Sequence, residues 1–481
     1  MRKIILLIFA IFFCSSIFSQ EYEIKVKIKG IHDTTIYLGY YFGKQSLIAD
    51  SAHIDDKNNA VFKGDKKLEN GIYLIAAPDQ PWIEIILGND RFFSIETDTT
   101  DLLANMKIKN SNENSIFLNY NRKIKDLYKK RQDLIGEYEL VKSNEEESKK
   151  VINKINTLNE ERENFINDII NKYPDYFLST YLKSLLEVKI PDPPQDENGN
   201  IIDPNFKYLY KKEHYFDNID LSERGLLRTR EFEENIDYYF SKMVYTTPDS
   251  LIKETHDFIQ KVYDAGDSLM YMYTVSHLLS YFETSKIMGM ESVFISIAED
   301  WYLSGKTPWS DSIFIHKLDS TINRRFPTQL GKTSPDMIRM QSIDGKYYTL
   351  SQLPHKYILI LFYEPDCGHC KKEVPEIMKE FRNSLKAMDV GVFAVYNQYD
   401  HEEWKKFIED NDLTEEGWYN VWDGPRPHSN YKYFFNIYSI PMTFILDENK
   451  KIIANKHLKV ETIIDLINFY ENFPESEDTD K

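Results

Sequence analysis

Between residue 21 and about residue 100, apolar and polar side chains alternate in short runs. The segments 22–30 and 35–40 alternate with a period of two, which is typical of half-buried strands, and residues 55–59 form a polar turn. Further short apolar runs stand at 60–64, 71–75, 82–87 and 91–95. Strands at this spacing predict an all-β sandwich or barrel.

From about residue 110 the apolar period lengthens to 3.6 residues. One stripe runs from Tyr120 to Tyr138 and another from Val151 to Ile169, so the two predict a helical hairpin. A proline-rich loop occupies residues 191–204. Further helices are predicted at 220–240, 249–265, 269–288 and 292–304. We interpret the aromatic stripes of this all-α region as core rather than as a ligand site.

After residue 327 the pattern mixes strands and helices. Buried strands are predicted at 357–363 and 390–395, because the runs are apolar throughout. Helices are predicted at 371–385, 402–411 and 460–469, and a hairpin at 442–454. The predicted segments are a signal peptide (1–19), a β-rich domain (20–108), a helical domain (109–326), an α/β domain (327–474) and an acidic tail (475–481).

The N-terminus has the layout of a secretory signal peptide. Arg2 and Lys3 precede an apolar run that is short for a membrane span, and Ser19 is a plausible last residue before cleavage. An uncleaved membrane anchor is the competing interpretation. Phe13 stands directly before Cys14, where a lipidation site needs a small residue. The net charge of −18 argues against nucleic acid and anionic lipid as partners.

The chain has three cysteines, so loss of the signal peptide leaves only Cys367 and Cys370. That number excludes a structural disulfide framework. The pair forms Cys-Gly-His-Cys between a predicted strand and a predicted helix. The helix dipole and free backbone N–H groups stabilise a thiolate there, and a thiolate attacks disulfides. The spacing therefore predicts a thiol–disulfide redox site.

Three other interpretations of the motif compete with this one. Zinc needs two more ligands, but no second cysteine pair exists and the nearby histidines His355, His401 and His428 are scattered. A peroxidase of the peroxiredoxin type has Pro and Thr upstream of its cysteine, where Ile360 and Glu364 stand here. The pair could also be a degenerate one with a purely binding role. We expect neither a metal nor an organic cofactor.

A second signal lies downstream, where Ile440 and Pro441 precede the strand Met442-Thr443-Phe444-Ile445. A proline at a strand start is often cis, and such a loop leaves backbone groups free to pair with an extended peptide. Strand, Cys-x-x-Cys, helix and this proline together resemble the thioredoxin superfamily. The lead-in 331–337 and the long interval before Pro441 resemble its exported TlpA/ResA-like branch. The resemblance covers residues 328–474.

This resemblance implies roles for individual residues. Cys367 would be the nucleophile, Cys370 the resolving thiol, and Pro441, with Ile440, part of the substrate loop. Glu373 stands where the branch keeps an acid that can accept a proton from the buried thiol; a first-turn acid favoured by the helix dipole is the equal alternative.

Two residues beside the cysteines have opposite effects on the stability of the thiolate. His369 stabilises the thiolate, and Cys-Gly-His-Cys is the motif of protein disulfide isomerase, so we expect a potential above that of thioredoxin. Asp366 disfavours the thiolate, so the size of the difference in potential from thioredoxin stays open. The buried Asp of thioredoxin is replaced by Leu361.

The predicted fold class is therefore multidomain: an all-β sandwich or barrel, an all-α middle domain and a thioredoxin-like α/β domain. With Asn171-Lys172-Tyr173-Pro174 and Gly305-Lys306-Thr307-Pro308-Trp309 in the helical part, the first two domains resemble Bacteroidetes-type exported proteins of poorly defined function. We expect an exported thiol–disulfide oxidoreductase in the periplasm or cell envelope of a Gram-negative bacterium, with protein thiols or disulfides as substrates and a membrane or periplasmic redox partner. The alternative is a periplasmic chaperone or scaffold with a vestigial thioredoxin domain. Oligomeric state and electron direction stay open.

Overall fold

The computed structural model describes residues 20–77, 79, 81–424, 430–437 and 439–472. The predicted signal peptide and acidic tail lie outside these described residues. The chain divides into two compact units. Unit 1 consists of Met1–Val244 and Lys261–Tyr271, and unit 2 of Tyr245–Gln260 and Met272–Lys481.

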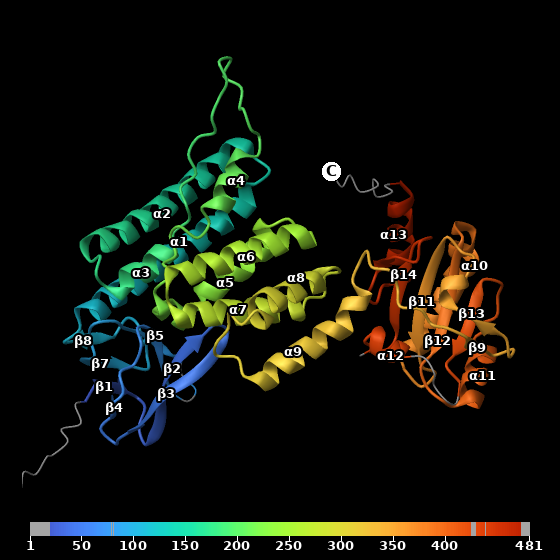
Figure 1. Cartoon of the computed structure of the whole chain (residues 1–481). Helices are drawn as coiled ribbons and strands as arrows, with labels where there is room; N and C mark the ends of the chain where they lie inside the picture. The colour runs from blue at the N-terminus through green and yellow to red at the C-terminus, as the bar shows by residue number, and fades with distance from the viewer. Residues whose placement is uncertain (1–19, 78, 80, 425–429, 438, 473–481) are drawn as a thin grey trace, which may run out of the picture. The chain divides into compact units, whose positions relative to one another are not determined.

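The first part of unit 1 is all-β, as the alternating pattern predicts (Figure 1). Its two four-stranded sheets have the orders β4-β1-β7-β8 and β3-β2-β5-β6. The strands are β1 (Tyr22–Lys29), β2 (Thr34–Phe42), β3 (Gln45–Ile54), β4 (Asn59–Gly64), β5 (Gly71–Ala76), β6 (Ile83–Leu87), β7 (Phe92–Asp98) and β8 (Lys107–Lys109). Their inward side chains, such as Ile24, Ile36, Phe62 and Ile85, form one buried core. The sequence pattern missed β3, because only its last residue is buried and apolar alternation is therefore weak there.

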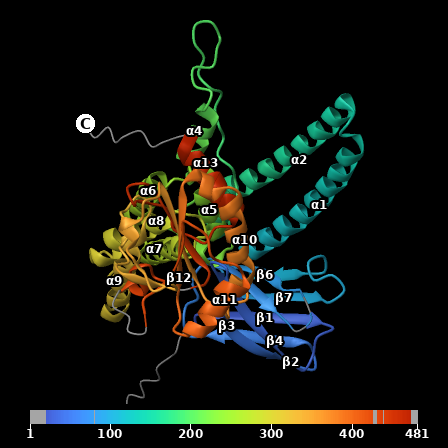
Figure 2. The same ribbon diagram turned by 90° about the vertical axis from the view of Figure 1, so that its right-hand side faces the viewer.

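The helical part of unit 1 begins with the predicted hairpin, which Figure 2 shows as two helices side by side. The side chains of Ser111 and Asn144 accept backbone N–H bonds and begin the two helices. The helices of this part are α1 (Asn112–Val141), α2 (Glu145–Lys172), α3 (Phe177–Ser184), α4 (Phe206–Glu213) and α5 (Glu231–Tyr238), followed by the π-helical segment η2 (Tyr239–Met243).

The prediction of one continuous helix over 220–240 is wrong. A 3₁₀ turn, η1 (Arg224–Arg228), precedes α5 instead. The Glu223 side chain accepts the Gly225 N–H at 2.8 Å and closes a tight turn. A Cβ at Gly225 would lie 2.6 Å from a Phe177 ring carbon, so this close approach needs glycine.

Residues of α6 (Pro248–Ala265) and α7 (Ser268–Glu283) are divided between the two units. Unit 2 continues with α8 (Met290–Ile297), the π-helical segment η3 (Ala298–Leu303), α9 (Ser312–Arg325) and the 3₁₀ turn η4 (Phe326–Thr328). The helix predicted at 269–288 thus ends earlier, at Glu283, and the one predicted at 292–304 changes to π-helix within its length. The middle of the chain is helical, as predicted.

The rest of unit 2 is a seven-stranded mixed sheet of order β10-β9-β13-β12-β11-β14-β15. The central strand β11 pairs parallel with β12 and antiparallel with β14. Its strands are β9 (Met340–Ser342), β10 (Tyr347–Tyr348), β11 (Tyr357–Tyr363), β12 (Val390–Tyr396), β13 (Trp418–Trp422), β14 (Met442–Leu446) and β15 (Ile452–Ala454). Its helices are α10 (Cys370–Asn383), α11 (His401–Asp410), α12 (Tyr431–Phe434) and α13 (Val460–Asn472), with the 3₁₀ turns η5 (Leu350–Gln352) and η6 (Leu385–Met388).

Every side chain of β11 is buried, because both faces of the sheet are covered. Leu359, Leu361 and Tyr363 belong to the core that includes residues of α10, α11 and α13. Ile360 and Phe362 point the other way, into the core that includes Phe435 just after α12. The period of two along β11 therefore fixes which helices meet which face.

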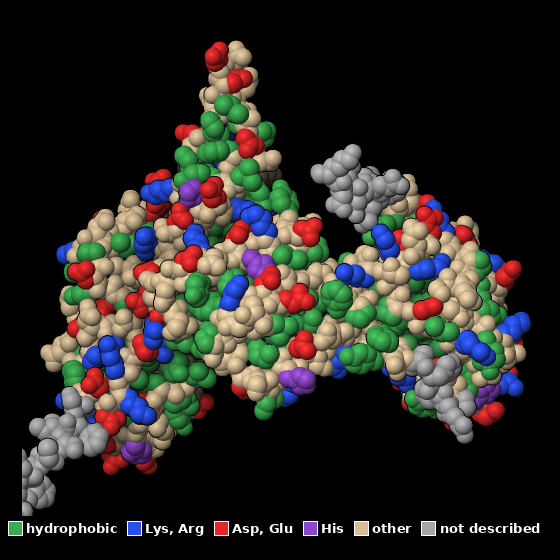
Figure 3. All heavy atoms as spheres, viewed as in Figure 1, with side chains coloured by type: hydrophobic (Ala, Val, Ile, Leu, Met, Phe, Trp, Pro, Cys, Tyr) green, Lys and Arg blue, Asp and Glu red, His purple; other side chains and the backbone are tan. Residues whose placement is uncertain are grey.

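The charged surface is mixed in sign. On the face that Figure 3 shows, acidic and basic side chains are intermixed rather than gathered into one patch. Such a surface favours solubility and offers that face no basic footprint for a polyanion.

Candidate functional site

The Cys-Gly-His-Cys segment directly follows the short turn after β11. His369 is the N-cap residue of α10 and Cys370 is its first residue. Cys367 stands just before the helix, where its backbone N–H bonds the Glu364 carbonyl at 3.2 Å. The unpaired N–H groups and the dipole of α10 therefore favour negative charge at this end.

Cys367 is the accessible member of the pair. It is half-buried, and its Sγ lies 3.5 Å from the carbonyl oxygen of Ile440. The Ile440–Pro441 peptide bond is cis. The structure thus brings together Cys367 and the predicted loop residues Ile440 and Pro441, which the sequence places more than seventy residues apart.

Cys370 is completely buried. Burial raises the pKa of its thiol well above the usual range. The backbone N–H of Glu364 donates to the sulfur and lowers the pKa, whereas Cys367 and the Glu364 carboxylate raise it further. Cys370 therefore needs a proton acceptor before it can attack a disulfide.

Two acidic side chains beside the cysteines are held by one amide. Gln398 Nε2 donates to Glu364 Oε2 at 3.2 Å and to Asp366 Oδ1 at 3.1 Å. Asn397 Nδ2 donates to the other Glu364 oxygen at 2.9 Å. The Glu364 carboxylate is consequently fixed near the Cys370 thiol by two amide donors, one on each oxygen.

Glu373 lies in the first turn of α10. Its Oε2 lies 2.9 Å from Nε2 of His457, and both side chains are about one-third exposed (31% and 37%). The predicted His369 is exposed on the same helix end. The role of Glu373 as a proton acceptor stays a prediction, now with His457 as its partner.

Sequence reasoning missed Glu364, Asn397, Gln398 and His457. A signal for the first three existed, because Glu364 directly follows β11 and Asn397 directly follows β12. The carboxyl ends of neighbouring parallel strands meet at one edge of a sheet, where polar side chains gather. No comparable signal marks His457, whose loop after β15 carries no periodic pattern.

Family comparisons divide the chain into three matched regions. Residues 22–117 match a domain of unknown function (DUF4369) and residues 142–318 match another (DUF5106). Residues 330–455 match the AhpC/TSA family. Through its C-terminal domain, the chain belongs to the thioredoxin superfamily. The matched region contains both cysteines and Pro441, so the thioredoxin-like resemblance is confirmed.

Several solved structures are similar to this thioredoxin-like chain. A domain of a possible thiol-disulfide isomerase from Cytophaga hutchinsonii is 34% identical, covering 30% of this chain and 95% of that one (TM-score 0.28). The thioredoxin domain of a Bacteroides vulgatus thiol-disulfide oxidoreductase is 26% identical, covering 30% and 96% (TM-score 0.25). A thioredoxin-like protein from Bacteroides caccae is 16% identical over 59% of this chain and 99% of that one (TM-score 0.46). No protein of curated function matches the chain.

Within the described residues, no helix of the thioredoxin-like chain combines the length and apolar character that a membrane crossing needs.

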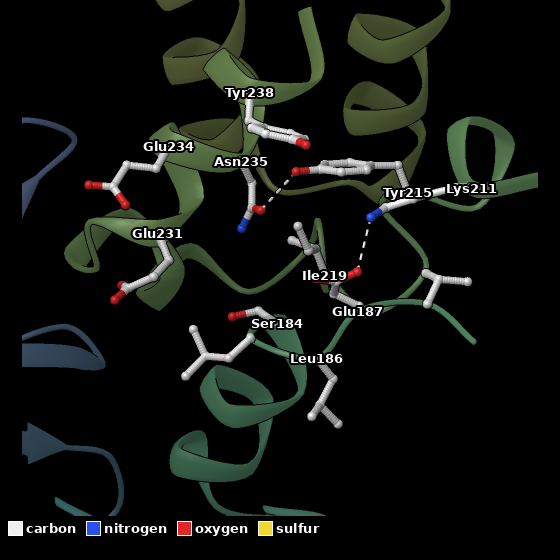
Figure 4. Close-up of a pocket in the computed structure, with 12 residues that line it drawn as sticks. Ser184, Leu186, Glu187, Lys211, Tyr215, Ile219, Glu231, Glu234, Asn235 and Tyr238 are labelled. Carbon is white, nitrogen blue, oxygen red and sulfur yellow. Dashed lines mark hydrogen bonds and ion pairs between the residues drawn. The ribbon is translucent and has the colours of Figure 1, made fainter. Parts of the chain in front are cut away.

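Unit 1 contains a separate pocket of about 440 Å³ (Figure 4). Lys211 Nζ pairs with Glu187 at 2.9 Å, and the Tyr215 hydroxyl donates to Asn235 at 3.1 Å. Tyr238 stacks on Tyr215 with ring centroids 6.1 Å apart. The Lys211 ammonium and the Tyr215 hydroxyl of this pocket are thus engaged with neighbouring side chains.

Proposed function

We propose that the chain is an exported protein thiol–disulfide oxidoreductase that works through Cys367 and Cys370. The observation that carries the proposal is the pair's placement. An accessible Cys367 at the start of α10 faces the Ile440 carbonyl, next to Pro441, and a buried Cys370 lies behind it. Free backbone groups of the Ile440–Pro441 loop can pair with an extended substrate segment, which favours a polypeptide substrate.

In the reducing direction, the Cys367 thiolate attacks a substrate disulfide. A bond forms between Cys367 Sγ and one substrate sulfur, and the other substrate sulfur leaves as a thiolate that takes up a proton. Cys370 then loses its proton to Glu373 and attacks Cys367 Sγ. The Cys367–Cys370 disulfide forms, the substrate leaves as a dithiol, and two electrons have passed to it. Oxidation of a substrate dithiol is the same sequence reversed.

Trapping tests this mechanism. Cys370→Ser keeps the nucleophile and removes the resolving thiol, so a disulfide-containing peptide should stay attached to Cys367. Cys367→Ser is the matched control and should capture nothing. A Cys370→Ser protein that releases the peptide as fast as the wild type would count against Cys370 as the resolving residue.

Equilibration of the pair with glutathione gives the direction of electron flow. A potential near about −270 mV would favour a reductase supplied by a membrane or periplasmic donor, and one near about −180 mV an oxidase or isomerase. A pair that never equilibrates would favour the alternative of a chaperone or scaffold with a vestigial domain. Export is tested separately: the mature protein recovered from the cell envelope should begin at Gln20 if the predicted signal peptide is cleaved.

A further inference from the structure

The loop between β15 and α13 carries three consecutive polar residues, Asn455, Lys456 and His457. His457 pairs with Glu373 in the first turn of α10. The two residues before it bond to another part of unit 2, the segment between α7 and α8 and the first turn of α8. One short loop therefore contacts the redox helix on one side and the helical region on the other.

Lys456 and Asn455 form four hydrogen bonds with the helical region. Lys456 Nζ donates to the carbonyl oxygens of Ser285 at 2.6 Å and Ile287 at 2.9 Å. Asn455 Nδ2 donates to Glu291 Oε2 at 2.6 Å and to the Thr328 carbonyl at 2.9 Å. Two carbonyl oxygens accept hydrogen bonds from one ammonium group, so the position of the segment relative to the loop is fixed.

The contacts of Asn455 are desolvated and those of Lys456 are partly so. Asn455 is only 3% exposed. Burial lowers the pKa of Lys456, which Glu291 opposes, and burial raises the pKa of Glu291, which Lys456, Asn455 and Arg325 oppose. Arg325 and Glu283 form a further ion pair at 3.3 Å. The Glu291 carboxylate accepts from the buried Asn455 amide and lies near the Lys456 and Arg325 charges, so displacement of the loop would leave a buried polar group without its partner.

The same loop is also tied to the strand behind Pro441. The Thr443 hydroxyl donates to the Lys456 carbonyl at 3.1 Å and accepts the Leu458 N–H at 3.2 Å. Met288 belongs to the segment that Lys456 hydrogen-bonds, and it packs against the core containing Cys370. Displacement of the loop would therefore move both His457 and the support of the cis-proline strand.

We propose that the segment Ser285–Glu291 is a positioning element of the redox site. It holds the Asn455–His457 loop, and the loop holds His457 against Glu373, the proton acceptor for Cys370. This inference rests on the proposed function. Residues 285–291 lie in the region matched by a domain of unknown function. The inference gives them a role in the second half of the reaction, when the Cys370 thiol loses its proton and the Cys367–Cys370 disulfide forms.

Single-turnover release of glutathione from Cys367 tests this inference in the full chain. The protein is first loaded with one glutathione on Cys367, and attack by Cys370 then releases glutathione as a thiol. Lys456→Met and His457→Phe should each slow the release about tenfold, within the range that a misplaced catalytic group costs. The double variant should be no slower than the slower single variant, because both act through Glu373.

Conservative variants separate positioning from general destabilisation. His457→Gln keeps a donor for Glu373 and Lys456→Arg keeps donors for the two carbonyls, so each should recover most of the wild-type rate. Lys459→Met removes an exposed lysine three residues further on and should leave release unchanged. If Lys456→Met does not fold, the comparison of His457→Phe with His457→Gln tests the Glu373 contact. Lys456→Arg then tests the contacts of residue 456 with the Ser285 and Ile287 carbonyls.

Two failures can be told apart. Wild-type protein that does not release glutathione, or Cys370→Ser that releases it equally fast, would overturn the proposed function itself. Wild-type release that depends on Cys370 but is unchanged by Lys456→Met and His457→Phe would overturn only the positioning role. Additive slowing in the double variant would also overturn it, since the two residues would then act independently.

Discussion

The hydroxyl of Tyr363 offers the sharpest test of how the strand before the cysteines is held. Tyr363 is the last residue of β11 and is fully buried, with no exposed side-chain area. Its oxygen accepts the indole N–H of Trp404 at 2.8 Å, and Trp404 on α11 is buried to the same degree. Tyr363→Phe removes the acceptor without changing the ring, so the indole N–H is left without that partner in a dry site.

Leaving a buried donor unsatisfied costs about 1–3 kcal/mol, and we expect about 2 kcal/mol here because water does not reach the pair. A loss of about 2 kcal/mol raises the population of opened molecules roughly 30-fold. Cys370 reports that opening within the full chain, since its buried thiol can be alkylated only when the domain opens. The measurement is the alkylation rate of Cys370, mapped by peptide and normalised to the rate in denaturant.

A double-mutant cycle isolates the hydrogen bond. Trp404→Phe removes the donor, so adding Tyr363→Phe to it should cost much less than in the wild type, with a coupling of at least about 1 kcal/mol. Tyr347→Phe, at a tyrosine that is 56% exposed, is the matched control and should leave Cys370 protected. Equal protection of Cys370 in Tyr363→Phe and the wild type, or a coupling near zero, would refute the reasoning.

Three further outcomes are expected. In the reduced native protein, iodoacetamide should modify Cys367 and spare Cys370 until the domain unfolds, because only Cys367 is accessible; peptide mapping checks this. Gly391→Ala should destabilise the domain by about 1–3 kcal/mol in the Cys370 protection assay, since a Cβ there would lie 2.3 Å from the His355 ring. Burial, then Cys367 and lastly the Glu364 charge raise the pKa of Cys370, so Glu364→Gln should lower that pKa slightly and shift the pH dependence of glutathione release downward; a shift upward would identify Glu364 as the proton acceptor.

The fold followed from apolar patterning wherever burial was one-sided or complete. β11 is apolar at all seven positions because both of its faces are covered. Of the stripe predicted for the first helix of the hairpin, Tyr120 and Leu127 are buried, whereas Tyr128 is 61% exposed. β3 was missed because it buries almost nothing, and the 220–240 helix was wrong because a tertiary contact at Gly225 decides the local backbone. Local patterns carry no information about such contacts.

The sequence likewise predicts some residues of the candidate site and misses others. Cys367, Cys370 and Pro441 are readable because each occupies a local context with a defined chemistry, whereas the partners of the acids are set by tertiary structure. Nothing near Glu373 in the sequence indicates His457, since the two meet only when α10 packs beside the loop after β15. Boundaries between functional regions are equally hard to read: the compact units cut through α6 and α7 rather than between predicted domains.

The electrostatics of the site also bear on the direction of electron flow. His369 stands between the two cysteines in the chain, but it is exposed, so solvent and salt screen any charge that it carries. Glu364 is half-buried and fixed by Asn397 and Gln398, so its charge acts on Cys370 at short range through a less polarisable medium. Burial first, then Cys367 and, as the smallest contribution, this carboxylate raise the pKa of Cys370 and disfavour its thiolate, and thiolate stabilisation is what makes a disulfide strongly oxidising. We therefore predict a reduction potential below the one that the motif Cys-Gly-His-Cys alone suggests, and equilibration with glutathione measures it.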